Sequence, residues 1–390
     1  MKMKVANITL DGRVAGPQSQ IVRVAERLRR KGIETVVLMP RRNSEIVYSQ
    51  LVERDIPVKR LNLHYLTTHK PHLVAYAFSF LPELCSLYWH LRRERVSLVH
   101  CNGSWQLKGV IAGKIAGAKV IWHIQDTCMP WAIRTLCRIL ARSLCDGLIF
   151  AGKSAKDHYA NGNGLGARRT AVIQAPVDTS HFNPDDVPPD SLMANTPGIK
   201  ISTVGYVNPF KGIEYFIEMA RILNATYQKL HFYIVGPELD SERTYAREMT
   251  RLSNRYNLKN VHFYGICDDV PRILKGTDIY VCSSVTEASP MSVWEAMAMR
   301  KAVVSTDVGD VRRFIEDGKN GFVVPPRDAE SLAHKVGILI ESEELRDSFG
   351  KRARATAVRD LDVGICADKF RRFYTEILRG GEIDHAITIQ

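Results

Sequence analysis

The sequence lacks any pattern that would pair its cysteines. Its eight cysteines include no C-x-x-C pair and follow no regular spacing, which argues against a zinc site or a disulfide scaffold and indicates reduced thiols. It also lacks low-complexity tracts and short-period repeats, and its hydrophobic share of 45% against 25% charged residues is ordinary for a globular protein. A mean hydropathy of −0.15 argues against a protein with several membrane spans.

Several catalytic signatures are absent as well. There is no G-x-S-x-G, no H-E-x-x-H and no Walker A sequence, and no D-x-D follows a predicted strand. These absences argue against an α/β-hydrolase, a zinc protease, a P-loop NTPase and a metal-held nucleotide sugar. The apolar part of the opening MKMKVANITL is too short for the hydrophobic region of a signal peptide. We therefore expect a cytoplasmic protein.

The positive charge is concentrated in one half of the chain. Residues 1–180 hold 27 Lys and Arg against 12 Asp and Glu, a net charge of +15, whereas residues 181–390 hold 27 against 30, a net charge of −3. This asymmetry predicts that the first half meets an anionic partner. Nucleic acid is one alternative, but basic clusters interleaved with aromatic residues are missing, so no nucleic-acid partner is expected.

The most hydrophobic stretch, residues 73–91, is nearly long enough to span a bilayer. Pro82 and Glu83 lie at its middle, and a carboxylate buried in lipid would be costly, which favours a buried or interfacial helix over a spanning one. The stretch is followed by three arginines, Arg92, Arg93 and Arg95. An apolar face edged by arginines suits an anionic membrane surface, so we expect peripheral attachment at the inner face of a membrane.

Short strand-like runs alternate with helical patterns along the whole chain. Strands are predicted at residues 4–10, 34–39, 58–61, 97–101, 119–124, 147–150, 170–173, 199–204, 230–235, 260–264, 278–282, 302–306 and 321–324. Helices are predicted at residues 18–31, 44–54, 73–93, 106–116, 131–145, 154–161, 212–225, 241–256, 270–274, 290–299, 329–340, 344–358 and 364–378. The alternation predicts an α/β fold with parallel sheets covered by helices on both faces.

The length of 390 residues and one change in local composition predict two domains. Residues 176–197 contain five prolines and no long apolar run, which is typical of a linker. We expect an N-terminal domain at 1–178, a linker at 179–198, a second domain at 199–360 and a C-terminal helical segment at 361–390. Ligands of doubly wound sheets bind beyond the carboxyl ends of the strands, so a ligand is expected in a cleft between the two domains.

The first candidate site is the loop that runs from Gly205 through Asn208 to Lys211 and Gly212. It follows a predicted strand and opens a predicted helix. A cation at a helix N-terminus opposes the helix dipole, and a bound anion removes the conflict. A solvated loop lysine is the alternative interpretation.

The second candidate site is the segment from Glu287 to Glu295, which follows the strand at 278–282. Ser289 suits an N-cap and Pro290 the first helical position, which leaves free N–H groups at Met291 and Ser292 for an anion. The two glutamates, expected less than ~10 Å apart along the axis, could bind hydroxyls on separate parts of one ligand. Two ordinary solvated glutamates are the alternative.

Two weaker signals lie in the first half. Gly16 belongs to a GRVAGPQ loop after the first strand and could approach phosphate, although the loop is not a G-x-G-x-x-G sequence. His123 ends the strand at 119–124 and is expected at the edge of the cleft, with Asp126 close enough in sequence to orient its ring. A plain turn and a structural histidine are the alternatives.

The order and spacing of these motifs resemble the retaining glycosyltransferases of family 4. The resemblance rests on G-x-x-N-P-x-K-G, on E-x₇-E about 75 residues later, on V-V-S-T-D-V-G, and on D-G-x-N-G-F-V-V-P-P-R-D. It is close from about residue 199 to 345 and looser in the first half. It implies the GT-B fold, in which two Rossmann-like domains face a deep cleft and a last helix returns to the first domain.

The resemblance also implies roles for the candidate residues. Lys211 would bind the diphosphate of a nucleotide-sugar donor, beside Gly205 and Asn208, and Gly16 would approach the phosphates. Glu287 would contact the donor sugar, beside the Met291 and Ser292 amides, and His123 would also reach this sugar. Glu295 would bind the ribose. The loop that starts at Gly265 would face the base. The catalytic residues are thus expected to be Glu287, Lys211 and His123.

The resemblance predicts a metal-independent, retaining transferase without a cofactor. The donor is expected to be a UDP-sugar, with a GDP-sugar as the alternative, and the acceptor a cell-envelope glycan or a lipid-linked sugar. Two alternatives keep the fold: a nucleotide-sugar epimerase, and an inactive module that binds glycans or partners. Tyr206 stands where the family usually has Arg, and Arg300 where it commonly has Gly.

Overall fold

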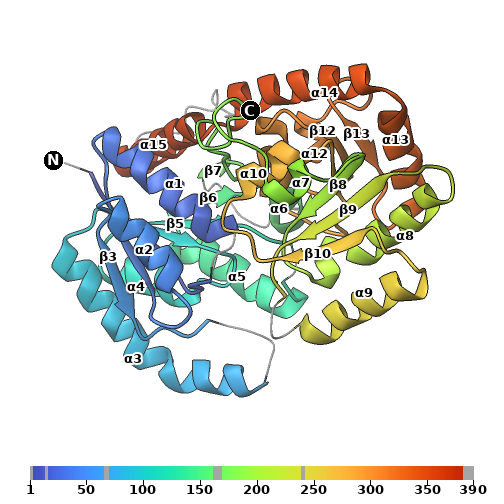
Figure 1. Cartoon of the computed structure of the whole chain (residues 1–390). Coiled ribbons are helices and arrows are strands. Elements are labelled where there is room, and N and C mark those ends of the chain that lie inside the picture. The colour runs from blue at the N-terminus through green and yellow to red at the C-terminus, as the bar shows by residue number, and fades with distance from the viewer. Residues whose placement is uncertain are drawn as a thin grey trace. The chain divides into compact units, whose positions relative to one another are not determined.

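The computed structural model describes residues 3–13, 16–65, 70–127, 129–160, 169–238 and 242–380. The chain divides into two compact units (Figure 1). Unit 1 consists of Met1–Pro176 together with Val363–Gln390, and unit 2 consists of Val177–Asp362. Each unit is an α/β domain with its own parallel sheet, so the predicted fold class is confirmed.

The described part of unit 1 has a seven-stranded parallel sheet in the order β3-β2-β1-β4-β5-β6-β7. Its strands are β1 (Lys4–Thr9), β2 (Glu34–Pro40), β3 (Val58–Leu61), β4 (Leu98–Asn102), β5 (Lys119–Ile124), β6 (Gly147–Phe150) and β7 (Arg169–Val172). The order reverses between β1 and β4, which pair in register from Val5 opposite Leu98 to Thr9 opposite Asn102. Such a reversal is the usual ligand position in an open α/β sheet.

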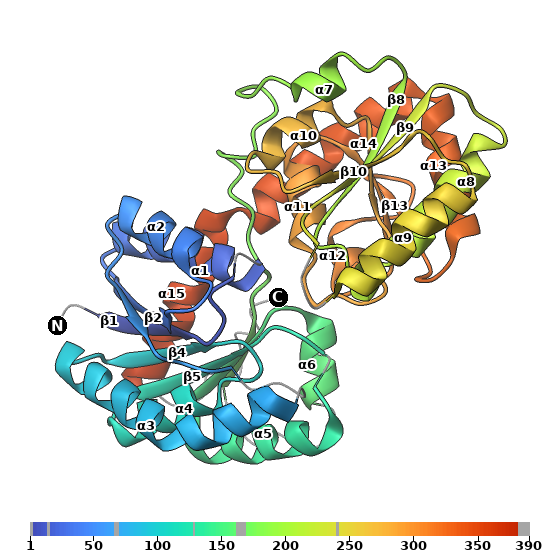
Figure 2. The ribbon, with the colours of Figure 1, turned by 60° about the horizontal axis from the view of Figure 1, so that its bottom comes forward.

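Helices cover both faces of this sheet (Figure 2). One face carries α1 (Gly16–Arg30), α2 (Glu45–Glu53) and α15 (Val363–Arg379); the other carries α3 (Lys70–Glu94), α4 (Leu107–Ile115) and α5 (Trp131–Leu144), and α6 (Lys153–Ala160) follows β6. The apolar face of α15 joins the core that α1 forms with β1, β4, β5 and β6. The resemblance implied a last helix that returns to the first domain, and α15 packs in unit 1.

Unit 2 has a six-stranded parallel sheet in the order β10-β9-β8-β11-β12-β13, among its described residues. Its strands are β8 (Ile199–Val204), β9 (Leu230–Val235), β10 (Val261–Gly265), β11 (Ile279–Cys282), β12 (Ala302–Thr306) and β13 (Phe322–Val324). Its helices are α7 (Ser191–Ala194), the 3₁₀ turn η1 (Pro209–Lys211), α8 (Ile213–Asn224), α9 (Arg243–Arg255), α10 (Val270–Gly276), α11 (Met291–Ala298), α12 (Val311–Phe314), α13 (Ala329–Glu341), α14 (Glu343–Thr356) and the π-helical turn η3 (Ala357–Leu361). Alternate residues of β11 pack on opposite faces, because Ile279 and Val281 join one core and Tyr280 the other.

The segment expected to be a linker, residues 179–198, packs on unit 2. Phe182 and Met193 are buried there, and Asp190 caps the short helix α7 by accepting hydrogen bonds from the Leu192 and Met193 N–H groups. The segment is therefore part of unit 2, although its proline content indicated a linker. The chain enters and leaves unit 2 side by side, since the Val177 N–H donates to the Leu361 carbonyl.

Within the described residues, no helix combines the length and the apolar composition needed to cross a membrane. The long helix α3 contains Pro82 and the buried Glu83, as the sequence indicated. Arg300, which stands where related sequences commonly have Gly, has a φ of 58°. Its guanidinium pairs with Asp347 at 2.9 Å.

Candidate active site

The candidate site of unit 2 lies where the order of its sheet reverses, between β8 and β11. Lys211 follows β8 and Glu287 follows β11, and both lie beyond the carboxyl ends of their strands. Their side chains meet, with the Lys211 Nζ 2.6 Å from Oε1 of Glu287. The fold therefore joins two residues 76 positions apart that the sequence had singled out separately.

The lysine loop is held by its own polar and small residues. The Asn208 Oδ1 accepts a hydrogen bond of 3.1 Å from the Lys211 N–H, so Asn208 caps η1. A Cβ on Gly205 would lie 2.9 Å from the Lys211 Cε, so glycine leaves room for the lysine stem. Gly212 has a φ of 59°, and a Cβ there would meet the Ser283 carbonyl oxygen at 2.3 Å. The structure thus gives Asn208, Gly205 and Gly212 the task of positioning Lys211.

The lysine–glutamate pair is half-buried, with side-chain exposures of 23% and 18%. Burial lowers the pKa of Lys211, but the nearby Glu287, Cys282 and Glu295 together outweigh it and raise the pKa above 10.5. Lys211 is therefore a permanent cation at physiological pH. Glu295, one turn along α11, is among the charges that raise this pKa.

Residues that the sequence interpretation missed hold Glu287. The Ser284 hydroxyl donates to Oε1 of Glu287 at 3.0 Å, and the Thr306 hydroxyl donates to the Ser284 carbonyl at 2.6 Å. Gly309 has a φ of 56°, and a Cβ there would come within 2.6 Å of the Ala288 carbonyl oxygen. Three loops, after β8, β11 and β12, are thus packed together. Ser284, the second residue after the end of β11, was the signal in the sequence.

The helix that follows Glu287 begins one residue later than predicted. Helix α11 starts at Met291, Pro290 is its N-cap without a side-chain cap, and Ser289 instead accepts a hydrogen bond from Trp294 Nε1 at 3.1 Å. The predicted Ser289 cap is wrong, because Trp294 is buried and its indole N–H needs an acceptor. The first-turn N–H groups of Met291 and Ser292 still lie at the helix N-terminus, as expected.

The loop after β10 supplies the remaining candidate of unit 2. Gly265 ends the strand with a φ of 79°, and its carbonyl accepts the Gly236 N–H at 2.8 Å, so the ends of β9 and β10 are tied. Ile266 follows and is 73% exposed. An exposed apolar side chain at this edge offers a surface on which a flat ring can lie.

The first-half candidates lie in unit 1. Gly16 is the first residue of α1, which follows β1 as predicted, and β1 lies at the order reversal of the sheet. His123 is the last residue but one of β5 and is wholly buried, between His100 and Phe370 of α15, with ring centroids 5.2 and 5.7 Å away. The expected position at a cleft edge is wrong, since α15 covers this face of the sheet. His123 Nδ1 faces His100 Nε2 at 3.2 Å and Gln125 Nε2 at 3.5 Å, while the Asp126 carboxylate accepts a hydrogen bond from the Tyr159 hydroxyl.

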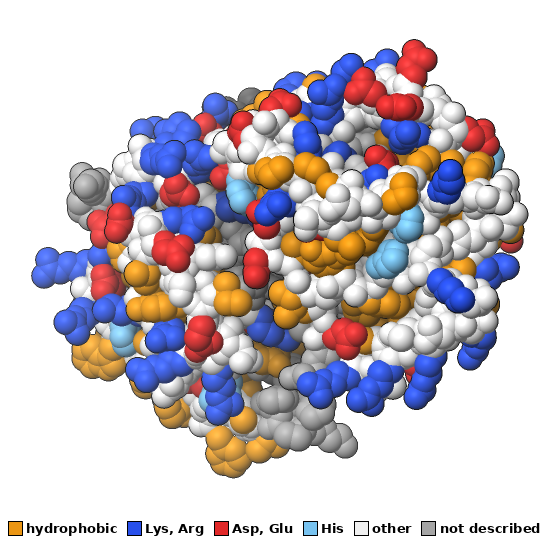
Figure 3. All heavy atoms as spheres, viewed as in Figure 1, with side chains coloured by type: hydrophobic (Ala, Val, Ile, Leu, Met, Phe, Trp, Pro, Cys, Tyr) orange, Lys and Arg blue, Asp and Glu red, His pale blue; other side chains and the backbone are white. Residues whose placement is uncertain are grey.

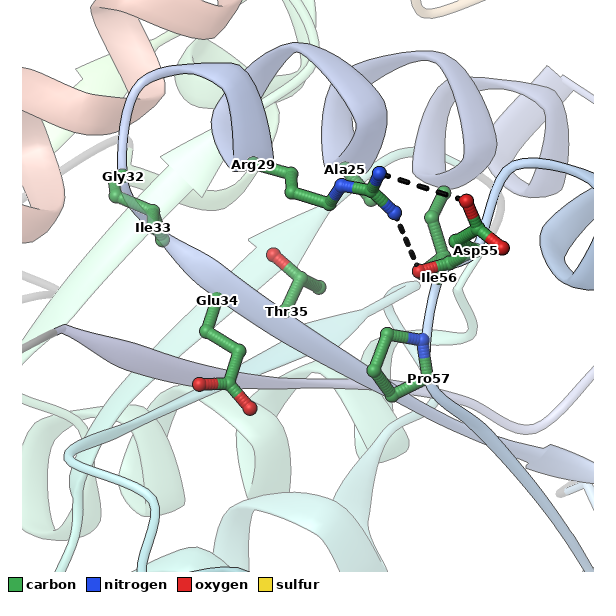
Figure 4. A pocket seen from close by; sticks show the side chains of 9 residues that line it. All are labelled: Ala25, Arg29, Gly32, Ile33, Glu34, Thr35, Asp55, Ile56 and Pro57. Carbon is green, nitrogen blue, oxygen red and sulfur yellow. Dashed lines mark hydrogen bonds and ion pairs between the residues drawn. The ribbon is translucent and has the colours of Figure 1, made fainter.

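A pocket of about 380 Å³ in unit 1 lies away from all of these residues (Figure 4). It opens at the amino end of β2, between the end of α1 and the segment before β3. Arg29 reaches across it and donates to the Asp55 carbonyl at 2.7 Å. Ligands of this fold class bind at the opposite, carboxyl edge, so we assign no catalytic role to this pocket.

Comparison with known proteins identifies the two halves separately. A family model described as Glycosyltransferase Family 4 matches residues 14–181, and one described as Glycosyl transferases group 1 matches residues 189–356. A Campylobacter jejuni N,N'-diacetylbacillosaminyl-diphospho-undecaprenol alpha-1,3-N-acetylgalactosaminyltransferase is 29% identical over 43% of this chain and 42% of its own. An Escherichia coli UDP-Gal:alpha-D-GlcNAc-diphosphoundecaprenol alpha-1,3-galactosyltransferase is 23% identical over 76% of this chain and 80% of its own. The chain spans about half the length of most of the curated relatives it matches.

Solved structures share the whole architecture. Anabaena HepE in complex with UDP and glucose superposes with a TM-score of 0.82 at 19% identity, covering 96% of this chain and 99% of its own. A glycosyltransferase from Rickettsia africae gives a TM-score of 0.81 at 18% identity, with 97% and 100% covered. With a family model matched in each half and this shared fold, the chain belongs to the group 1, family 4 glycosyltransferases of the GT-B fold.

Proposed function

We propose that the protein transfers a sugar from a nucleotide-diphosphate donor to a lipid-linked or cell-envelope glycan. A UDP-sugar is the favoured donor, and a GDP-sugar is the alternative. The observation that carries this proposal is the Lys211–Glu287 pair at the order reversal of the unit 2 sheet. Further support comes from HepE, which was solved with UDP and glucose, and from two relatives whose names specify undecaprenol-linked acceptors.

Each residue of the site has a distinct part in this proposal. Lys211, a permanent cation, binds the diphosphate together with the Met291 and Ser292 amides at the N-terminus of α11. Glu287, fixed by Ser284, accepts hydrogen bonds from the donor sugar. Glu295, one turn into α11, accepts hydrogen bonds from the ribose.

The reaction breaks the bond between the anomeric carbon and the diphosphate oxygen and forms a bond from that carbon to an acceptor oxygen. The proton of the acceptor hydroxyl passes to the leaving phosphate, and both bonds lie on the same face of the sugar, so configuration is retained. Lys211 and the α11 N-terminus stabilise the negative charge that develops on the leaving diphosphate. This arrangement needs no divalent cation.

Transfer from a UDP-sugar should therefore proceed in EDTA at the rate seen with Mg²⁺, and the product should keep the anomeric configuration of the donor. Proton NMR of the product gives the configuration, and a rate assay with and without EDTA gives the metal dependence. Activity that is lost in EDTA and restored by Mg²⁺ or Mn²⁺, or an inverted product, would contradict the proposed mechanism. If none of the nucleotide sugars is turned over, the protein is better described as an inactive binding module.

We also propose that unit 1 attaches to an anionic membrane surface through α3 and α5. Helix α3 exposes Val74, Phe78, Leu81 and Trp89 at helical spacing, with Phe78 84% exposed. Orange apolar side chains project along this helix beside blue basic ones (Figure 3). Helix α5, on the same face of the sheet, exposes Trp131 to 74% together with Leu136 and Ile139.

A buried ion pair explains why these apolar side chains face outward. Glu83, on the inner side of α3, accepts a hydrogen bond of 2.6 Å from Lys108 Nζ of α4, and it also accepts the His64 N–H at 3.0 Å. Lys108 is fully buried, with its Nζ 3.7 Å from the centre of the Tyr76 ring. The pair fixes the rotation of α3, so that Phe78 and Leu81 point to solvent. The arginines at the end of α3 then suit the headgroup region.

The protein should sediment with phosphatidylglycerol vesicles at low salt, far less at 0.5 M salt, and hardly with phosphatidylcholine vesicles. Each arginine near an anionic surface contributes about 1 kcal/mol, so reversing Arg92, Arg93 and Arg95 to Glu should weaken binding at least ~100-fold. The matched control reverses three exposed arginines of α9 in unit 2, Arg243, Arg247 and Arg251. Equal sedimentation of both triple variants would refute the proposed surface.

A further inference from the structure

A tyrosine outside the lysine loop supports the backbone that carries Lys211. Helix α8 begins at Ile213, two residues after Lys211, and its N-cap is Gly212, which has no side chain that could cap the helix. The Ile213 N–H instead donates a hydrogen bond of 3.1 Å to the hydroxyl of Tyr245, in the first turn of α9. The start of α8 is therefore tied to a helix that begins 30 residues further along the chain.

The direction of the hydrogen bonds around this hydroxyl follows from the groups that meet it. A backbone N–H can only donate, so the Tyr245 hydroxyl accepts from Ile213 and donates its own proton to the carboxylate of Glu214. Burial and the nearby Glu214 raise the pKa of Tyr245, and the hydrogen bonds from the backbone of Glu214 and Ile213 oppose this rise only in part. The phenol therefore keeps the proton that it donates.

The first turn of α8 is satisfied by the chain itself. The N–H groups of Ile213 and Glu214 both meet the Tyr245 hydroxyl, and the Glu214 carboxylate supplies a negative charge at the positive end of the helix dipole. The sequence indicated a bound anion at this helix N-terminus, but these groups do not need one. The Lys211 side chain is then the part of this segment that is left to meet a diphosphate.

Hydrogen bonds hold the backbone of Lys211 from three directions. Its N–H donates to Asn208 Oδ1 at 3.1 Å, within the same loop, and its carbonyl accepts the Ser283 hydroxyl of the loop after β11 at 3.0 Å. Tyr245 supplies the third contact, through Ile213. Loss of this contact frees the backbone on the helix side of Lys211, and small displacements of a group that binds substrate are costly.

We propose that Tyr245 is a positioning residue of the donor site: its hydroxyl, oriented by Glu214, fixes the backbone at Ile213 and so holds the Lys211 ammonium group where the donor diphosphate binds. Tyr245 acts through Lys211 and makes no contact with the donor. The part that concerns the diphosphate rests on the proposed function.

Calorimetry with UDP on the full chain measures the effect. Tyr245→Phe should weaken UDP binding about 3- to 10-fold, as the loss of one hydrogen bond predicts. Glu214→Gln keeps an acceptor oxygen for the Tyr245 hydroxyl and should bind UDP nearly as the wild type does, whereas Glu214→Ala should resemble Tyr245→Phe. The matched control is Tyr227→Phe, which removes a hydroxyl that donates to Glu341 at 2.6 Å beyond the other end of α8, and it should leave UDP affinity unchanged.

The Lys211→Met background shows whether Tyr245 acts through Lys211. In that background, the addition of Tyr245→Phe should cause no further measurable loss of UDP affinity, because the group that Tyr245 positions is already absent. An equal loss in both backgrounds would overturn the proposal, since it would mean that Tyr245 acts on the donor by another route. Wild-type UDP affinity in Tyr245→Phe or in Glu214→Ala would also overturn it.

Hydrogen exchange without UDP gives a readout that does not depend on the donor. Backbone amides of residues 209–214 should exchange faster in Tyr245→Phe than in the wild type and in Tyr227→Phe, and unchanged exchange would refute the support of this backbone by Tyr245. Faster exchange in Tyr245→Phe together with wild-type UDP affinity in Lys211→Met would place the failure in the proposed function and would remove Tyr245 from the donor site with it.

Discussion

Replacing Lys211 by methionine is expected to weaken UDP binding by about 10- to 150-fold, the range for loss of a hydrogen bond to a charged group. Transfer should slow by ~10²–10³, the usual cost of removing one group that stabilises developing charge. The effect is large because Tyr206 stands where related enzymes usually have a second cation. Calorimetry with UDP gives the affinity, and a rate assay at saturating donor gives kcat.

Lys211→Met also leaves Glu287 without its cationic partner, so loss of activity could come from misplaced loops. The double variant Lys211→Met with Glu287→Gln removes both charges and should regain the melting temperature of the wild type without regaining UDP affinity. Lys259→Ala, at an exposed lysine of unit 2, is the control for charge alone. Unchanged UDP affinity in Lys211→Met would refute the assignment of the diphosphate to this residue.

The two glutamates should separate kinetically. Glu287→Gln should lower kcat and leave UDP binding nearly intact, since Glu287 is assigned to the transferred sugar. Glu295→Ala should weaken binding of free UDP, since Glu295 is assigned to the ribose. Similar behaviour of both variants would show that the ligand is not divided between them in this way.

The largest expected effect on stability is at Glu83. Glu83→Gln leaves the ammonium group of Lys108 buried without a counter-charge, which should cost about 3–5 kcal/mol in the free energy of unfolding. At roughly 2–4 °C per kcal/mol for a domain of this size, the melting transition of unit 1 should fall markedly. Glu94→Gln is a matched control on the same helix. Glu94 pairs with Lys4 at 2.7 Å but is 25% exposed, so about 1 kcal/mol or less is expected.

The pH dependence gives a second check on Glu83. Burial raises the pKa of its carboxyl, but hydrogen bonds from Lys108 and His64 outweigh burial and hold the pKa below 4.5. This stabilisation is therefore present above the ordinary pKa and is lost as the pH falls through the lowered one. The gap in stability between the wild type and Glu83→Gln should narrow in acid. A gap that is small at pH 7, or one that widens in acid, would contradict the buried-pair interpretation.

The sequence was sufficient for what depends on local pattern. Apolar runs such as Gly147–Phe150 were predicted to the residue, because a strand buried on both faces is a continuous apolar segment. The Lys211 and Glu287 loops were found because both follow predicted strands, and the rule for ligand position in α/β sheets then brings them together.

The sequence was not sufficient for contacts between distant segments. Nothing near His123 shows that α15 will cover it, because Phe370 and Tyr374 lie some 250 residues further along the chain. Nothing near Glu83 shows that Lys108 will neutralise it. In the same way, serine is a common capping residue, but the Ser289 hydroxyl instead accepts a hydrogen bond from the indole N–H of Trp294.

Hydrogen–deuterium exchange of the full chain with and without UDP tests the central claim most directly. UDP should slow exchange of the backbone amides in residues 204–213, 265–270 and 284–295, the three loops at the carboxyl edge of the unit 2 sheet. Exchange in residues 25–35 and 55–57, which line the pocket at the amino end of β2, should stay unchanged. Protection centred on that pocket, or none in the three loops at saturating UDP, would contradict the placement of the donor site at Lys211 and Glu287.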